Sequence, residues 1–381
     1  MALKASRRAA IDPFIVMEVM RAANERAASG GDVIHMEVGQ PSTPAPRAVR
    51  EAAQKALDRD LIGYTDALGV PALRRRIAQH YSEFYDIDVA ASRIAVTTGS
   101  SGGFLLAFLA AFDPGDRVAL AMPGYPCYRH ILAALGLEPV LIETGPETKF
   151  QPTIAALEAL AGRLDGLIIA SPSNPVGAVL PAAELDVIAA WCAKNGVRLV
   201  SDEIYHGITF GTHASSAACH DGAIVINSFS KYFSMTGWRL GWMVLPDDLV
   251  KPVERLAQNF FISAPSLSQL AGGAAFDAHE ELQGNVARYA QNRELLLNEL
   301  PRAGFDDLTS TDGAFYIYAH VAKLTDDSLG FCRRMLAETG IAATPGIDFD
   351  PARGRHYMRF CFSGATADMA EAARRLIAWR K

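Results

Sequence analysis

Seven short runs of apolar residues alternate with longer segments of helical pattern between residues 92 and 245. The runs are almost continuously apolar, which is typical of strands that a sheet buries on both faces. In order, they read "RIAVTT", "RVALAM", "EPVLIE", "LDGLIIAS", "VRLVSDE", "AIVINSF" and "LGWMVL". Segments such as "GGFLLAFLAAF", "YRHILAALG" and "AAELDVIAAWCAKNG" lie between several of them and carry apolar residues at helical spacing. This alternation predicts an α/β fold with a mostly parallel sheet covered on both faces.

The pattern becomes less regular after residue 280. A long polar helix is predicted over "EELQGNVARYAQNRELLLNEL", followed by "GAFYIYAHV", the helix "DSLGFCRRMLAETG", the strand "HYMRFCFS" and a last helix, "ADMAEAARRLIAWRK". Such mixing is typical of an α+β domain, and the first forty or so residues are expected to pack with it. We therefore predict a large domain over residues 42–280 and a smaller α+β domain made of residues 1–41 and 281–381.

Composition narrows the class of protein. Half of the 381 residues are hydrophobic and 20% are charged, as in a globular protein with a large core. The formal net charge is −6 and no basic tail is present, which argues against a nucleic-acid partner. The longest uninterrupted apolar run, "FLLAFLAAF", is too short to span a membrane, which takes about 20 residues.

The five cysteines include no CxxC pair, so neither a disulfide framework nor a metal site is expected, and a reducing compartment fits. Arg7 and Arg8 resemble a twin-arginine signal, but Asp12 and Pro13 interrupt the chain before any apolar stretch. We expect a cytoplasmic protein.

The residues that follow the predicted strands carry the candidate chemistry, because open parallel sheets bind ligands beyond the carboxyl ends of their strands. After "RIAVTT" comes "GSSGG", which opens a helix. Free N–H groups and the helix dipole favour a phosphate there, and the hydroxyls of Ser100 and Ser101 add donors. A plain helix cap with a tight turn is the alternative.

Lys231 follows the strand "AIVINSF". A buried amine loses hydration and its pKa falls, which suits a nucleophilic lysine. Asp202 ends another buried strand, where an ionised carboxylate needs a cationic partner unless it caps a helix. Asn174 and Tyr205 add donors at the same edge, and Arg239 adds a cation for a phosphate. Pyridoxal 5′-phosphate (PLP) requires such a set: a lysine, phosphate donors and an acid facing its ring nitrogen.

Two other enzyme classes share parts of this pattern. "GSSGG" also fits the G-x-S-x-G motif of serine hydrolases, with Ser101 as nucleophile and Asp202 and His206 in the right chain order. That hypothesis lacks a preceding HGGG-like segment and leaves Lys231 and Arg239 without a role. "SFSK" matches the S-x-x-K motif of penicillin-binding enzymes, but the companion motifs S-D-N and K-T-G are absent.

Eight segments, taken together in their order and spacing, resemble class I/II PLP-dependent aminotransferases of fold type I, the aspartate aminotransferase-like group. They are "VGQPSTPAP", "GYTDALGVPALRRRIA", "TTGSSGG", "MPGYPCY", "SPSNPVG", "SDEIYHGI", "SFSKYFSMTGWRLGW" and "HYMRFCFS". The resemblance covers nearly the whole chain. It implies a mostly parallel seven-stranded sheet in the large domain, PLP as cofactor, and ping-pong transfer of an amino group between an L-amino acid and a 2-oxo acid.

The resemblance also implies a role for each matching residue. Lys231 would form the Schiff base with PLP and then shuttle the proton, while Asp202 would pair with the ring nitrogen. Tyr205 and Asn174 would hydrogen-bond the ring oxygen. The remaining cofactor contacts would be a stacking Tyr125 and the phosphate ligands Ser100, Ser101, Ser228 and Arg239.

Substrate and partner contacts follow from the same resemblance. Arg359 would bind the substrate α-carboxylate as a bidentate fork, with Gly39 beside it, whereas Arg353 and Arg355 are interpreted as surface charges. Tyr64 would reach the phosphate of a neighbouring subunit, which makes a homodimer the expected active unit. No residue for the substrate side chain is identified, so aspartate specificity does not follow.

Two alternatives keep the cofactor. A carbon–sulfur β-lyase on the same fold would use the same residues to hold PLP. A non-catalytic PLP-binding regulator would carry a DNA-binding domain, for which this chain has neither the spare length nor the charge.

Overall fold

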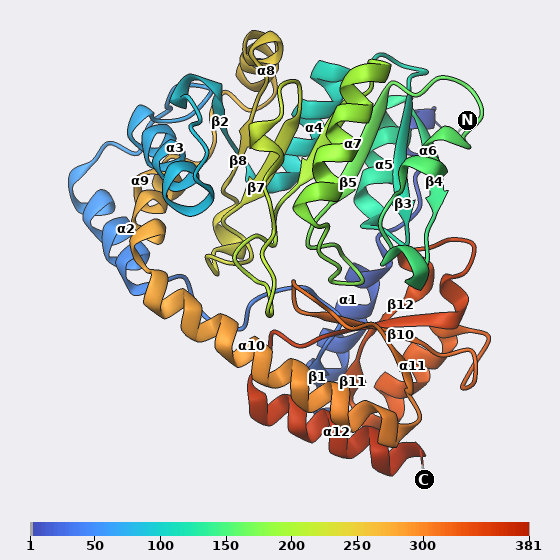
Figure 1. Cartoon of the computed structure of the whole chain (residues 1–381). Helices are drawn as coiled ribbons and strands as arrows, with labels where there is room; N and C mark the ends of the chain where they lie inside the picture. The colour runs from blue at the N-terminus through green and yellow to red at the C-terminus, as the bar shows by residue number, and fades with distance from the viewer. Residues whose placement is uncertain (1–2, 381) are drawn as a thin grey trace.

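The computed structural model describes residues 3–380. A sheet of seven strands in the order β2-β8-β7-β6-β5-β3-β4 forms its larger part (Figure 1). All strands run parallel except β8, which pairs antiparallel with β2 and β7. The strands are β2 (Ile94–Thr97), β3 (Arg117–Met122), β4 (Glu138–Glu143), β5 (Gly166–Ala170), β6 (Arg198–Asp202), β7 (Ile224–Ser228) and β8 (Gly241–Val244).

Helices cover both faces of this sheet, as the near-continuous apolar strands predict. In β5, Leu167 and Ile169 belong to one buried cluster and Ile168 to the other, because successive side chains of a strand point to opposite faces. The flanking helices are α4 (Gly99–Ala111), α5 (Pro126–Leu135), α6 (Ile154–Glu158), α7 (Ala182–Asn195) and α8 (Asp247–Phe260).

A second, antiparallel sheet of four strands in the order β12-β13-β10-β9 lies below the first (Figure 1). Beside it, β1 and β11 pair in parallel, so the start and the end of the chain meet. The strands are β1 (Ile34–His35), β9 (Asp307–Leu308), β10 (Tyr316–His320), β11 (Ile341–Ala342), β12 (Thr344–Pro345) and β13 (Tyr357–Cys361).

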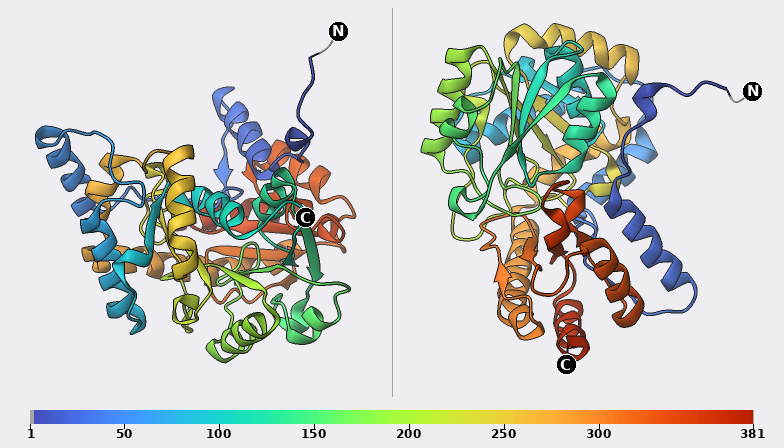
Figure 2. Two further views of the ribbon diagram at one scale, coloured as in Figure 1. Left: turned by 90° about the horizontal axis from the view of Figure 1, so that it is seen from above. Right: turned by 90° about the vertical axis from the view of Figure 1, so that its right-hand side faces the viewer.

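One long helix, α10, runs along the side of the molecule from the large sheet to the small one (Figure 1). The helix α1 lies next to the C-terminal segments, as Figure 2 shows. The remaining α-helices are α1 (Ile15–Ala28), α2 (Arg47–Arg59), α3 (Pro71–Tyr85), α9 (Ser266–Gly272), α10 (His279–Glu299), α11 (Ser328–Thr339) and α12 (Thr366–Arg380). The 3₁₀-helices are Arg7–Ala9, Ala91–Arg93, Pro146–Thr148, Ala217–Cys219, Thr236–Trp238, Gly273–Asp277, Leu300–Ala303, Gly346–Asp348 and Gly354–His356.

The predicted α/β architecture is confirmed. All seven predicted strands join the large sheet, and the segment "GSSGG" forms the first turn of α4. The two sheets lie on either side of the predicted boundary at residue 280, but the domain limits themselves stay a prediction. Within residues 3–380, no helix is long and apolar enough to cross a membrane.

Candidate active site

A cavity of about 560 Å³ lies where the carboxyl edge of the large sheet faces the C-terminal sheet. Its volume is in the usual range for small-molecule sites. All but two of the residues predicted from the sequence line it: Gly39, Ser100, Ser101, Tyr125, Asn174, Asp202, Tyr205, Lys231, Arg239 and Arg359.

Lys231 lies in the turn after β7, and its Nζ donates a hydrogen bond to the carbonyl oxygen of Gly39. Burial lowers the pKa of Lys231 to about 8, because the charged ammonium loses its hydration. At pH 7 about a tenth of this amine is therefore unprotonated, far more than for an ordinary lysine, and this is the form in which an amine acts as a nucleophile or a base.

Asp202 is the last residue of β6 and is buried. Its carboxylate accepts hydrogen bonds from the N–H of Ile204, at 3.1 Å, and from the hydroxyl of Tyr128. Burial raises the pKa of Asp202 to about 6, although both hydrogen bonds act in the opposite direction. Along the described chain no lysine or arginine side chain forms an ion pair with Asp202.

Tyr128 was missed at the sequence level. It stands in the first turn of α5, at the end of the quoted segment "MPGYPCY", and it lines the cavity. The only signal was its position three residues after Tyr125, which places the two side chains on one side of the helix. Their rings pack edge-to-face at 5.3 Å between centroids.

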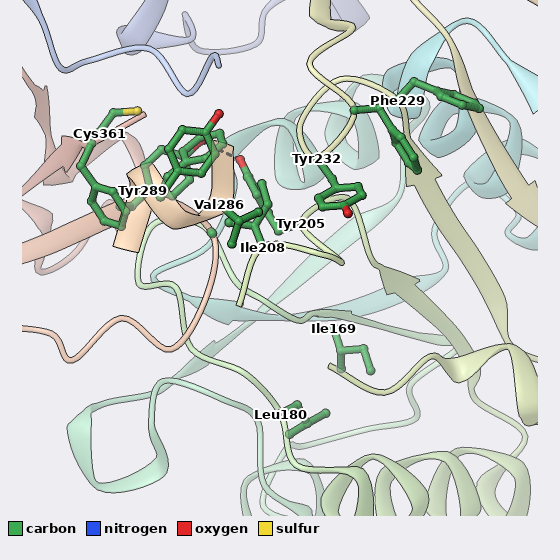
Figure 3. Packing of buried hydrophobic residues seen from close by; sticks show 14 of the residues in the cluster. Ile169, Leu180, Tyr205, Ile208, Phe229, Tyr232, Val286, Tyr289 and Cys361 are labelled. Carbon is green, nitrogen blue, oxygen red and sulfur yellow. Dashed lines mark hydrogen bonds between the residues drawn. The ribbon is translucent and has the colours of Figure 1, made fainter. Parts of the chain in front are cut away.

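A second missed tyrosine, Tyr316, comes from β10. Its hydroxyl lies 2.6 Å from that of Tyr205, a contact at the junction of the two sheets. Figure 3 shows Tyr205 among the buried hydrophobic residues. A Cβ atom on residue 39 would lie 1.7 Å from the Tyr316 hydroxyl, so only glycine fits at Gly39. The predicted glycine is thus required for a close approach that the sequence did not reveal.

Arg359 reaches the cavity from β13 with its guanidinium held by neutral groups. Nη1 donates to Oδ1 of Asn174 at 2.8 Å, and Nη2 donates to Thr344 Oγ1 at 3.2 Å and to the carbonyl of Glu37. Its Nε is buried without a partner. Because none of these partners is an anion, the positive charge of Arg359 stays available to a ligand carboxylate.

Two aromatic rings pack against the guanidinium of Arg359. The guanidinium carbon lies 4.2 Å from the ring centroid of Tyr316 and 4.7 Å from that of Phe349. Such cation–π contacts fix the plane of the guanidinium. Since the amide oxygen of Asn174 is taken by Arg359, the amide nitrogen is left as the donor for a ligand oxygen.

The two neighbouring arginines differ from each other. Arg355 is exposed and donates to the ring of His356, as expected for a surface charge. Arg353 is only 34% exposed and forms ion pairs with Asp350 at 2.8 Å and Glu143 at 3.0 Å. Arg353 is therefore an ion-paired, partly buried charge near the surface, and neither arginine lines the cavity.

The first turn of α4 and Arg239 form another part of the cavity lining. Thr98, which precedes the helix, makes no side-chain cap, so the first N–H groups of α4 are free of a capping side chain. A Cβ on Gly99 would lie 2.6 Å from Nη2 of Arg239, so the guanidinium lies directly on the start of the helix. A cation at the positive end of a helix dipole is unfavourable unless an anion lies between them, and this arrangement fits a phosphate.

Two predicted residues lie elsewhere. The hydroxyl of Ser228 is within 2.9 Å of Ser230 Oγ and 3.1 Å of the Leu240 carbonyl, and it is Ser230 that lines the cavity. Tyr64 is 82% exposed on a loop outside the cavity. The roles predicted for Ser228 and Tyr64 stay predictions.

The aminotransferase class I and II family matches residues 31–376 of the chain. The chain belongs to this family. It is an aminotransferase, and enzymes of this kind move an amino group between an amino acid and an oxo acid. This result supports transamination over the carbon–sulfur β-lyase alternative.

Several relatives share almost the full length. A valine–pyruvate aminotransferase of Mycobacterium tuberculosis is 52% identical over 98% of this chain and 97% of its own. A (5-formylfuran-3-yl)methyl phosphate transaminase of Methanocaldococcus jannaschii is 32% identical over 96% of each chain.

Solved aminotransferase structures agree with the fold. The crystal structure of an aminotransferase from Mycobacterium tuberculosis has 50% identity and a TM-score of 0.97, covering 99% of both chains. The aspartate aminotransferase from Thermus thermophilus with maleate has 28% identity and a TM-score of 0.93, covering 99% of this aminotransferase and 100% of that chain.

The serine hydrolase hypothesis was wrong for a geometric reason as well. The predicted serine hydrolase mechanism needs a histidine within hydrogen-bond reach of Ser101. Ser101 lines the cavity, but His206 does not, and its Nδ1 lies 2.7 Å from the hydroxyl of Tyr85. Burial also lowers the pKa of His206 to about 3, so this histidine is a buried neutral group of the core.

Proposed function

We propose that this aminotransferase binds PLP in the cavity and moves an amino group, by a ping-pong mechanism, between an L-amino acid and a 2-oxo acid. One observation carries the proposal: a buried amine, a buried carboxylate and an anion site line the same cavity. These are Lys231, Asp202, and the first turn of α4 with Arg239.

The residues present fit PLP at each of its polar groups. The first turn of α4, Ser100, Ser101 and Arg239 would hold the phosphate. Asp202, which has a raised pKa and no cationic side-chain partner in residues 3–380, would keep a ring nitrogen protonated. When bound, PLP supplies an aldehyde that takes up amines and a ring that delocalises the electron pair left by α-proton removal.

The chain's own residues would then do three things. Arg359 would orient the substrate through its α-carboxylate, in the plane set by Tyr316 and Phe349. The amine of Lys231, held near the site by the Gly39 carbonyl, would take the α-proton and return it to a different carbon. Tyr205 would hold the ring oxygen in place, with its hydroxyl oriented by Tyr316.

We further propose L-valine as amino donor and pyruvate as acceptor. The support is the 52% identity with a relative named as a valine–pyruvate aminotransferase. The apolar side of the cavity, described below, suits an aliphatic donor.

The experiment incubates purified protein with PLP, L-valine and pyruvate and quantifies both products. We expect alanine and 3-methyl-2-oxobutanoate in equal amounts, and none from Lys231→Ala. Borohydride treatment should fix the cofactor on the peptide that contains Lys231, as read by mass spectrometry. Labelling of another peptide, or turnover by Lys231→Ala at the wild-type rate, would contradict the proposal. Release of pyruvate from a sulfur-containing amino acid in the absence of any 2-oxo acid would instead favour the carbon–sulfur β-lyase.

We also propose that the active unit is a homodimer. Large apolar side chains are exposed near Tyr64. They come from the end of α2 and the loop that follows it, and from the end of α8 and the segment that follows it: Leu57, Leu61, Ile62, Phe260 and Ile262. The two segments are joined where the N–H of Thr65 donates to Ser263 at 3.4 Å. A patch of this kind is typical of a protein interface.

A further inference from the structure

One wall of the cavity is apolar and comes from the N-terminal helix α1. Phe14, just before the helix, and Val16, Met17 and Met20 within it all line the cavity. Val16 and Met20 are four residues apart, so they lie on the same face of the helix. Met17 is 47% exposed and lies at the rim.

The charged residues of the cavity all lie elsewhere. Lys231, Asp202, Arg239 and Arg359 are the only lysine, arginine, aspartate or glutamate side chains that line it within residues 3–380. Each has a partner group on the proposed cofactor or on the substrate carboxylate. The wall formed by α1 therefore offers neither a cation to an acidic substrate side chain nor an anion to a basic one, whereas it suits an aliphatic side chain.

The position of this wall depends on a residue from the other end of the chain. Phe14 supplies no side-chain cap to α1. Instead the carboxylate of Asp348, which is 1% exposed, accepts the N–H of Ile15 on Oδ1 and that of Val16 on Oδ2, each at 3.1 Å. A carboxylate at the start of a helix satisfies free N–H groups and interacts well with the dipole.

Asp348 also adjoins the carboxylate site. The next residue, Phe349, is the ring that packs against the guanidinium of Arg359 at 4.7 Å. Arg129 holds the same backbone, because its Nη2 donates to the carbonyl of Asp348 at 2.7 Å. Asp348 and Phe349 thus connect the apolar wall to Arg359. This connection sets the distance between a bound α-carboxylate and the wall.

We propose that Asp348 is a positioning residue for substrate selection, and that it acts by holding Val16, Met17 and Met20 against the substrate side chain. The proposal rests on the proposed function. In this proposal the α1 wall selects a short aliphatic side chain. The cap supplied by Asp348, near the other end of the chain, places that wall.

The first test compares two donors that differ only in reaching the wall. In Asp348→Ala we expect kcat/KM for L-valine to fall about tenfold, mainly through KM, because the contacts of its branched side chain are lost. For L-alanine, whose methyl group is too short to use the wall fully, we expect a change of about twofold or less. An equal fall for both donors would mean that Arg359 was disturbed instead, and would overturn the proposal.

A matched control separates placement from stability. Asp327 caps α11 in the ordinary way, by accepting the N–H of Gly330 at 3.0 Å, and lies outside the cavity. Asp327→Ala should also lose stability through the loss of a helix cap, yet keep the valine-to-alanine ratio of wild type. If Asp327→Ala shifted that ratio as much as Asp348→Ala, the effect would be one of general stability.

The wall itself is tested by Met20→Ala, with Val19→Ala as control. Val19 does not line the cavity and packs against the cluster of Ala23, Leu336 and Ala342. Met20→Ala should raise the ratio of kcat/KM for L-leucine over L-valine about tenfold, since it opens room for a longer side chain. Val19→Ala should leave the ratio unchanged. The reverse pattern would place the substrate side chain elsewhere.

Two further measurements link Asp348 to the wall without relying on turnover alone. Hydrogen exchange should show faster exchange over residues 15–28 in Asp348→Ala than in Asp327→Ala. The double variant Asp348→Ala/Met20→Ala should shift the valine-to-alanine ratio hardly more than the stronger single variant, because both act on one contact. Additive shifts would overturn the proposal, whereas a wild-type protein that transaminates no amino acid would refute the proposed function itself.

Discussion

The two charged residues Arg359 and Asp202 are held by hydrogen bonds to uncharged groups, so their charges remain available to a ligand. Arg359 is fixed by Asn174, Thr344 and a backbone carbonyl, and Asp202 by Tyr128 and a backbone N–H. Both side chains are buried, and a buried charge without a counter-ion is costly. The site therefore binds an oppositely charged group more strongly than an exposed pair of the same residues would.

Arg359→Lys is expected to raise KM for the amino donor and for the 2-oxo acid alike, by about ten- to a hundredfold, because an ammonium replaces a planar fork of charge-assisted hydrogen bonds. Steady-state kinetics with each substrate varied in turn would measure this. Arg355→Lys is the matched control, since Arg355 is exposed on the segment just before the same strand. If Arg355→Lys raised both constants and Arg359→Lys neither, Arg355 would be the carboxylate ligand.

The pKa of Asp202 predicts how the cofactor-free protein responds to pH. Because the pKa of about 6 in the folded state lies above the ordinary aspartate value of 3.8, the protonated form of Asp202 stabilises the folded state. This contribution to stability is lost as the pH rises through 6. Between pH 4.5 and 7.5, wild type should therefore lose about 2 kcal/mol more unfolding free energy than Asp202→Asn. Urea unfolding of both apoproteins at the two pH values checks this, and parallel losses would contradict it.

At the scale of elements, the site is built from the ends of strands and the starts of helices. The strands β6 and β7 bring Asp202 and Lys231 to one edge, and the guanidinium of Arg239 lies against the first turn of α4 in the same cavity. Glycine at position 99 permits this approach, with a φ of +71°. The start of α4 and the arginine are therefore a single anion-binding unit.

Gly99→Ala should weaken PLP binding at least about tenfold, because a methyl group would displace the guanidinium of Arg239 and strain a left-handed residue. Gly115→Ala is the matched control, since Gly115 has a φ of +97° but no neighbour within 4 Å of an added Cβ. Both variants carry the backbone strain, and only Gly99→Ala crowds the arginine. Dissociation constants for PLP, measured by fluorescence titration, should differ between the two; equal values would show that the crowding is harmless.

The sequence predicted those parts of the molecule whose signals are local. The seven strands were found because buried parallel strands are nearly continuous apolar runs, and Lys231 and Asp202 were found because charges directly after such runs are unusual. Tyr316 could not be found, since its role depends on a contact with Tyr205, 111 residues away. Nor could the wall of α1, because its cap lies 333 residues further along the chain.

At the scale of the whole molecule, Tyr64 connects the site to assembly. It lies outside the cavity of its own chain, within an exposed apolar patch. If its hydroxyl completes the phosphate site of a partner, neither subunit is complete alone.

Mixing two variants tests this. If the site is shared in this way, Lys231→Ala and Tyr64→Ala would each lack one part of it. A mixed dimer would then hold one complete site, made of Lys231 from one chain and Tyr64 from the other. Unfolding and refolding an equal mixture should restore about a quarter of wild-type activity, since half of the dimers are mixed and each has one good site. Sedimentation should show a dimer, and no recovery above the separate variants would exclude sharing.

The pairing of the first strand with the last segments has a consequence for synthesis. The carbonyl of Met36 accepts the N–H of Cys361, and β1 pairs with β11. Residues 34–39 can therefore make these contacts only after roughly 300 further residues have been synthesised. At the usual pace of translation this interval lasts about 15–60 s. The large sheet, with Lys231 and Asp202, leaves the ribosome before Arg359 does. The carboxylate site around Arg359 is therefore completed later than the part of the cavity that holds Lys231 and Asp202.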